Sequence, residues 1–199
     1  MGDSLGFRRK FAVVAPSTNT IVQPEFDAMA PRGVTNHFGR VHIPNDPIRN
    51  DDDFNQLIQN IRSELLRAID RCMTCEPDYL VMGMSSETFW GGVEGNAQFI
   101  ERVKDQSGLK VSTGASACRA ALERYGVRRI AVLSPYQPIA DRQVTRYFEE
   151  AGFEVLRFRG LRCPTATSIA DVPEAQLLPI IRDELNGPDV EAIVQVGTL

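Results

Sequence analysis

Two stretches of the chain decide its fold: RRKFAVVAPST at residues 8–18 and RRIAVLSPYQP at residues 128–138. Each consists of two arginines, a short apolar run, and a proline within a polar turn. A short apolar run rich in β-forming residues is typical of a buried parallel strand. Because the same order of features recurs, we interpret the second stretch as the start of a duplicated strand–helix–strand unit.

Between these stretches lies the clearest helical pattern, at residues 51–75. Its apolar residues recur at spacings of three and four, and Asp51–Asp53 place negative charge where the helix dipole favours it. Elsewhere apolar runs alternate with helical patterns, which predicts an α/β fold with parallel sheets and right-handed crossovers. The other expected strands are 78–84, 109–113, 153–160 and 191–198, and the other expected helices are 115–124, 139–151 and 174–185.

The predicted organisation is two α/β halves, residues 1–124 and 125–199, with the site in the cleft between them. A buried strand needs cover on both faces, and the last expected strand ends at residue 198. We therefore expect the sequence to stop before the final helices of the second half.

Composition excludes several classes of function. The chain has 199 residues, a net charge of -4 and 43% hydrophobic residues, which is ordinary for a globular protein. This mild acidity gives no reason to expect nucleic acid or an anionic membrane as a partner. No apolar run approaches the roughly 20 residues that span a bilayer, and MGDSLGFRRK lacks the apolar stretch of a secretory signal. We expect a cytoplasmic protein.

Four cysteines raise the question of a redox or metal site. Cys72 and Cys75 form a C-x-x-C at the end of a helical pattern, whereas a thioredoxin-like motif lies at a helix start after a strand. No second C-x-x-C completes a zinc site. We therefore expect no metal, and we interpret Cys72 as a core residue of the helix.

Polar loops follow four of the expected strands, and in parallel sheets ligands bind at these carboxyl ends. Hydroxyls, amides, glycines and free N–H groups at such ends suit an anion. The alternative is that these side chains only cap helices, as Ser, Thr and Asn commonly do. The loops are PSTNT at 16–20, GMSSETFWGG at 83–92, SPYQP at 134–138 and VGTL at 196–199.

Other candidate groups are few. Glu87 is either a general acid or base or a first-turn carboxylate favoured by the helix dipole. Ser85 or Ser86 can act as a nucleophile only with a base within hydrogen-bond reach, for which His37, His42 and Glu87 are the candidates. The two histidines lie five residues apart in a strand-like segment, so they face opposite sides and cannot share a metal.

Together the loops resemble the aspartate/glutamate racemase superfamily, and most closely its branch of maleate cis–trans isomerases and arylmalonate decarboxylases. The likeness covers nearly the whole chain and is strongest at APSTNT (15–20), VMGMSSETFWGG (81–92), GASACRAALERYGVRRIAVLSPY (114–136) and AIVQVGTL (192–199). It implies two flavodoxin-like parallel-sheet halves related by a pseudo-two-fold axis. It also implies a small carboxylic acid as substrate, no cofactor, and a homodimer as the family-level expectation.

The resemblance also assigns residues to the site. Six positions match ligand-facing positions of the family, either through side chains or, for the last two, through backbone N–H groups: Asn19, Ser85, Ser86, Tyr136, Gly197 and Thr198. The family's two catalytic cysteines fall on Met84 and Val196, neither of which can donate a proton or act as a nucleophile. Neither Cys118 nor Cys163 lies at these two positions: Cys118 is expected in a helix, and Cys163 is the one that can approach the cleft.

Three functions are therefore open. The first is an isomerase or decarboxylase for a small acid such as maleate or a substituted malonate, with Tyr136, Glu87 or Ser86 as its catalytic group. The second is a carboxylate-binding protein without turnover. The third is a hydrolase with Ser85 or Ser86 as its nucleophile.

Overall fold

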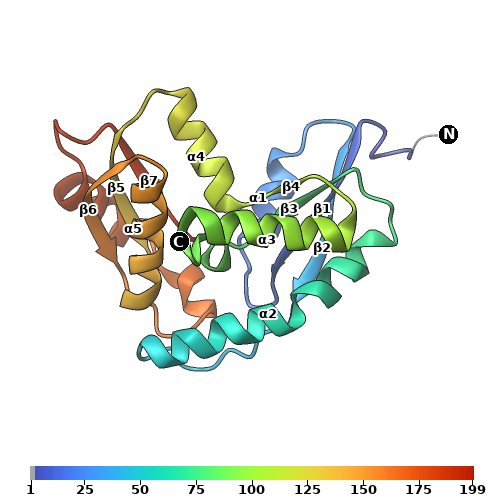
Figure 1. Cartoon of the computed structure of the whole chain (residues 1–199), viewed down its shortest axis with the longest axis horizontal. Coiled ribbons are helices and arrows are strands. Elements are labelled where there is room, and N and C mark those ends of the chain that lie inside the picture. The colour runs from blue at the N-terminus through green and yellow to red at the C-terminus, as the bar shows by residue number, and fades with distance from the viewer. Residues whose placement is uncertain (1–2) are drawn as a thin grey trace.

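A computed structural model describes residues 3–199 and contains two parallel sheets (Figure 1). The first sheet has the strand order β2-β1-β3-β4, and the second has the order β6-β5-β7. In both, the strand that comes first in the chain lies in the centre, between the strands that come second and third. The similarity between residues 8–18 and 128–138 thus corresponds to a repeated topology, and the predicted α/β fold class is confirmed. The strands are β1 (Arg9–Pro16), β2 (Val34–Val41), β3 (Tyr79–Met82), β4 (Val111–Ser112), β5 (Arg129–Ser134), β6 (Glu154–Gly160) and β7 (Ala192–Gln195).

Helices connect these strands. They are α1 (Val22–Met29), α2 (Asp51–Met73), α3 (Gly92–Ser107), α4 (Gly114–Arg124), α5 (Pro138–Glu150) and α6 (Glu174–Pro179), with the 3-10 turns η1 (Ser86–Phe89) and η2 (Thr167–Asp171) and the π-helical segment η3 (Ile180–Leu185). The pattern at 174–185 predicted a single helix, but the structure divides it into α6 and η3 at Pro179. Proline has no N–H to continue the hydrogen-bond ladder, which explains the change of helix type there.

The predicted long helix is confirmed as α2. Its first turn is capped by the Asn50 side chain, which accepts a hydrogen bond of 2.9 Å from the Asp53 N–H. Its buried face includes Phe54, Ile58 and Ile61, as the spacing of apolar residues predicted. Figure 1 shows α2 and α3 running across the molecule from one sheet toward the other. These helices therefore join the two sheets through a shared core.

The central strands explain why the two deciding stretches are so apolar. Residues 12–15 of β1 and 130–133 of β5 are completely buried, because helices cover both faces of each sheet. The strands of the first sheet all precede residue 124, and those of the second all follow it. The division of the chain into halves at this point stays a prediction.

In the C-x-x-C motif, Cys72 is a core residue of the helix, as the sequence indicated. All four cysteines are free thiols, and Cys72 packs in the main core from α2. Burial raises the pKa of Cys72 to about 11, so its thiol is protonated at neutral pH. No helix within residues 3–199 is both long and apolar enough to cross a membrane.

Candidate active site

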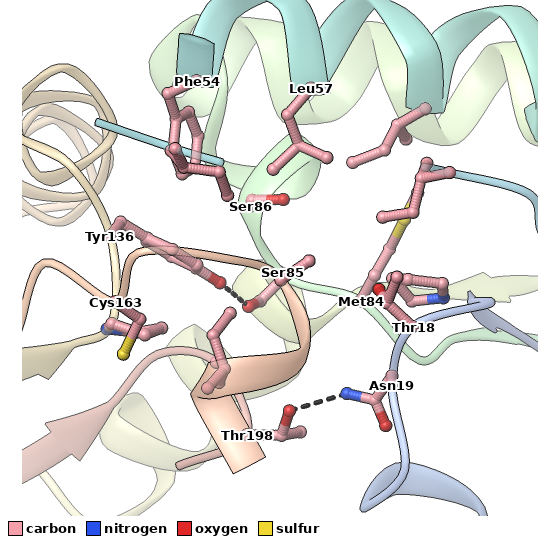
Figure 2. Close-up of a pocket in the computed structure, with 18 of the residues that line it drawn as sticks. Thr18, Asn19, Phe54, Leu57, Met84, Ser85, Ser86, Tyr136, Cys163 and Thr198 are labelled. Atoms are coloured by element: carbon pink, nitrogen blue, oxygen red, sulfur yellow. Dashed lines mark hydrogen bonds between the residues drawn. The ribbon is translucent and has the colours of Figure 1, made fainter. Parts of the chain in front are cut away.

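A cavity opens where the loops after β1, β3, β5 and β7 meet (Figure 2). The cavity is small, with an enclosed volume of about 80 Å³. The four loops predicted from the sequence thus converge. The predicted residues that line the cavity are Asn19, Ser85, Ser86, Tyr136, Gly197 and Thr198.

Two side-chain hydrogen bonds cross this cavity, and each joins a loop of the first sheet to a loop of the second. The Ser85 Oγ and the Tyr136 hydroxyl are 2.5 Å apart. The Asn19 Nδ2 donates to the Thr198 Oγ1 at 2.7 Å. We call Ser85 and Tyr136 the tyrosine pair, and Asn19 and Thr198 the asparagine pair. Figure 2 shows Met84 on the opposite side of the cavity from Tyr136. Both pairs present hydroxyl or amide groups that a carboxylate can accept hydrogen bonds from.

Asn19 both caps a helix and faces the cavity, the two alternatives that the sequence left open. Its Oδ1 accepts hydrogen bonds from the N–H groups of Ile21 and Val22, at 3.0 and 2.8 Å, and so caps the start of α1. This fixes the amide plane and leaves the Nδ2 pointing across the cavity to Thr198. Ser85 differs, since its side chain makes no capping bond to η1 and is engaged by Tyr136 instead.

Tyr136 is the most buried polar group of the cavity, with 6% of its surface exposed. Its ring packs edge-on against Phe54 at a centroid distance of 5.5 Å. Burial raises the pKa of Tyr136 to about 12, against a smaller lowering by the hydrogen bond to Ser85. At neutral pH its hydroxyl is therefore protonated and can donate.

One wall of the cavity is apolar. It is formed by the first turns of α2, the segment before α2, and the loop after β6, through Phe54, Leu57, Ile61, Ile43, Ile48, Ala166 and Ile169. The spacing of apolar residues along α2 predicted a buried face, but not that part of this face lines a cavity. One feature of the sequence could have indicated this wall: the apolar face of α2 begins in the first turn of the helix, directly after a polar loop. Within residues 3–199, no Asp, Glu, His, Lys or Arg lines the cavity.

Glu87 does not reach the cavity, contrary to its proposed part in catalysis. It is buried between α2 and α3, where its Oε1 accepts a hydrogen bond from the Arg62 Nε at 2.7 Å and lies 3.7 Å from the Arg102 Nη2. Burial raises the pKa of Glu87, although both arginines oppose this. The sequence placed Glu87 in the right loop, but η1 turns its side chain away from Ser85 and Ser86.

The histidines are also absent from the cavity lining. His37 lies in β2 and is 3.0 Å from the Thr35 hydroxyl, and His42 is exposed just after the strand. Ser85 and Ser86 consequently have none of the three expected bases beside them. Cys163 does line the cavity, at its margin beyond Tyr136, whereas Cys118 lines a neighbouring cavity together with Val196.

Comparison with known proteins shows the family of the chain. A family model described as arylmalonate decarboxylase matches residues 52–197. The chain belongs to this family. It is also 26% identical over 215 residues to a maleate isomerase of Pseudomonas putida KT2440, an alignment that covers 94% of the chain and 78% of that protein. The resemblance inferred from the loop motifs is therefore confirmed.

Solved structures related to the family share the fold. A maleate cis–trans isomerase of Nocardia farcinica bound to TRIS matches with a TM-score of 0.83 and 20% identity, over 96% of this chain and 80% of its own. An arylmalonate decarboxylase structure matches with a TM-score of 0.66 and 17% identity, over 96% of this chain and 79% of its own. At these identities the likeness concerns the fold alone.

Met84 and Val196 are the two residues that the sequence resemblance singled out. Met84 lines the cavity with its thioether, and Val196 is buried with its N–H donating to the Leu133 carbonyl at 2.9 Å. These are the positions at which the resemblance places cysteines. Gly197 follows with a φ of 97°, and a Cβ there would lie 2.8 Å from the Pro135 ring, so the loop requires glycine.

Proposed function

We propose that this protein is a cofactor-independent isomerase or decarboxylase that acts on a small mono- or dicarboxylic acid, such as maleate or a substituted malonate. The observation that carries the proposal is the tyrosine pair, a 2.5 Å contact between the Ser85 and Tyr136 hydroxyls across a cavity. No charged side chain within residues 3–199 lines this cavity. Membership of the arylmalonate decarboxylase family supports the same reaction class.

In the proposed complex, a substrate carboxylate takes the place of the hydrogen bond between the two hydroxyls. Each hydroxyl then donates to one carboxylate oxygen, and Ser86 adds a third donor from the same turn. Because the surroundings are apolar, such hydrogen bonds are stronger than in water. If carbon dioxide leaves from a second carboxylate, the negative charge that develops on the enediolate oxygens is stabilised by the same donors.

The apolar wall supports decarboxylation of a malonate. A carboxylate held against Phe54 and Leu57 loses its hydration shell, and the departure of neutral carbon dioxide removes that charge from the apolar surroundings. The C–C bond breaks, and its electron pair remains as an enediolate. A proton must then reach the carbon. Tyr136 is a protonated donor on the cavity wall, and water can return its proton afterwards.

Cis–trans isomerisation by covalent addition fits this chain less well. A variant of the Nocardia farcinica enzyme carries a covalently bound succinylcysteine intermediate. Here Met84 and Val196 provide no thiol at the corresponding positions. Within the proposed class, decarboxylation followed by protonation is therefore the better supported reaction.

The direct test is proton NMR in deuterated water with maleate, methylmalonate and phenylmalonate. The expected result is loss of carbon dioxide from a substituted malonate, with deuterium at the α-carbon of the product. Tyr136→Phe should lower the rate, whereas Tyr125→Phe should not, since Tyr125 is 86% exposed and outside the cavity. The absence of turnover with every acid tested would argue against the enzymatic proposal.

A carboxylate-binding protein without turnover is the second candidate. It is favoured by the loss of both family thiols while the two polar pairs are present. Selective broadening or shift of a carboxylate ligand without conversion, in the same NMR experiment, would support this candidate. The hydrolase is not proposed further, because neither Ser85 nor Ser86 has a histidine or carboxylate beside it in the cavity.

A further inference from the structure

Two of the four ligand-facing loops are each held by an arginine from the second strand of their own sheet or from just beyond it. Arg40, in β2, donates from Nη1 to the carbonyls of Asn19 at 2.8 Å and Pro16 at 3.2 Å. Arg162, two residues after β6, donates to the Tyr136 carbonyl at 2.5 Å. The repeated topology thus places a guanidinium behind both the asparagine pair and the tyrosine pair.

The two arginines differ in how their charge is balanced. Arg162 forms an ion pair with Asp141, a buried carboxylate that also binds Ser134. Arg40 has no carboxylate within ion-pair distance among residues 3–199, and its Nη2 donates to the neutral Gln23 Oε1 at 2.7 Å. Its guanidinium also lies 5.4 Å from the centre of the Phe38 ring. The asparagine pair therefore has a net positive charge behind it, and the tyrosine pair does not.

We propose that Arg40 is a positioning residue of the site, which fixes Asn19 opposite Thr198 and supplies the positive charge that draws a ligand carboxylate to the asparagine pair. The second part of this inference rests on the proposed function, since it needs a carboxylate ligand; the first part does not. Arg40 itself does not line the cavity, so it acts through the Asn19 loop.

The geometry explains why an arginine is needed here. One guanidinium satisfies two carbonyls of the 16–19 loop and the Gln23 side chain at the same time, which a lysine ammonium on a flexible stem cannot reproduce in one plane. The half-buried charge is less screened than one on the open surface. No charged side chain within residues 3–199 lines the cavity, so Arg40 places an unbalanced positive charge directly behind the Asn19 loop.

The first measurement needs no ligand. The ¹H–¹⁵N resonances of the Asn19 side-chain amide are compared in wild type, Arg40→Gln, Arg40→Lys and Arg32→Gln. Arg32 is an exposed arginine outside the cavity, so Arg32→Gln removes the same charge without touching the loop. We expect the Asn19 amide to shift and to exchange faster with solvent in both Arg40 variants only. Unchanged Asn19 resonances in Arg40→Gln, or equal changes in Arg32→Gln, would overturn the positioning role.

The second measurement separates charge from position. Dissociation constants are determined for maleate and for its neutral diamide, at low and high salt. Arg40→Gln should weaken maleate about tenfold, and the diamide clearly less, with the difference shrinking at high salt. Arg40→Lys should keep more of the maleate affinity than Arg40→Gln. Equal weakening of both ligands would overturn the charge role and leave only a structural one.

Failure of the proposed function can be distinguished from failure of the Arg40 proposal. If wild-type protein binds neither maleate nor a substituted malonate, the carboxylate proposal fails, whereas the Asn19 amide comparison still decides whether Arg40 positions the loop. Thermal melting of each variant shows whether it is folded, and Arg40→Lys provides a second variant if Arg40→Gln does not fold.

Discussion

Replacing Tyr136 with phenylalanine removes a single oxygen from the centre of the proposed site. The ring keeps its edge-on contact with Phe54, because phenylalanine fills the same volume. What is lost is the 2.5 Å hydrogen bond to the Ser85 Oγ in the free protein, and one donor to the carboxylate in the complex. Fold and cavity shape should therefore be unchanged, and the effect should appear in binding and rate.

The expected size follows from the kind of bond. A hydrogen bond to a charged group contributes about 1.5–3 kcal/mol, which corresponds to a roughly 10- to 150-fold increase in the dissociation constant of the acid. The bond in the free protein joins two neutral hydroxyls and contributes about 0.5–1.5 kcal/mol. Since 1 kcal/mol shifts the melting temperature of a protein of this size by about 2–4 °C, stability should fall only slightly.

The assay is titration of phenylmalonate by calorimetry or NMR, with Tyr125→Phe as the matched control. Ser85→Ala should weaken binding by a similar factor. The double variant should cost less than the sum of the two, because the two hydroxyls contact each other. Affinity and rate within twofold of wild type in Tyr136→Phe would refute the assignment of the tyrosine pair as the carboxylate site.

Further predictions concern pH, packing and the missing thiol. Because burial raises the pKa of Tyr136 to about 12, the acid form persists and activity should not fall as pH passes through 10; a midpoint near 10 in a rate profile would contradict this. The same shift means that folding stability should decline above pH 10, where tyrosine ionises in the unfolded chain, as urea titrations at several pH values can check. Phe54→Ala removes a ring with 2% exposure and should lower the free energy of unfolding by about 3–5 kcal/mol, measured by urea denaturation. Asp141→Asn weakens the hydrogen bonds to Arg162 and Ser134 and should cost about 1–3 kcal/mol in the same assay. Met84→Cys places a thiol on the cavity wall, and should add deuterium exchange at the α-carbon of the product acid, with Met84→Leu as the control that shows none.

The fold could be predicted because its signals are local and repeated. The apolar runs of β1 and β5, the spacing along α2 and the alternation of strands and helices each point to the same α/β arrangement, and the structure has it. What the sequence did not predict depends on single backbone details. Pro179 changes the helix type within an apolar pattern that otherwise continues, and α1 is too short and polar to show clear periodicity.

The site was predictable only as far as loop position determines it. Parallel strands bring their carboxyl ends together, which predicts that the four loops meet at one cavity, and the family resemblance singled out Asn19, Ser85, Tyr136 and Thr198 within these loops. Loop position does not determine direction, and Glu87 is the example. It lies only two residues from Ser85, yet one turn of η1 is enough to point it into a cluster with arginines. The apolar wall was missed for the opposite reason, since helix periodicity does not distinguish a face that covers a core from one that covers a cavity.

The combination of features restricts the chemistry more than any one of them. Met84 and Val196 provide no thiol, and no charged side chain within residues 3–199 lines the cavity. Cys163 does line it, but burial raises the pKa of its thiol, so the site has little means of attacking a substrate or removing a proton from it. What it has are neutral donors in two pairs, an apolar wall, and an uncompensated arginine behind one pair. Such a site can bind a carboxylate, desolvate a second one and stabilise the anion that remains. Loss of carbon dioxide needs those three properties and a proton donor, whereas racemisation and covalent isomerisation need a base or a nucleophile in addition.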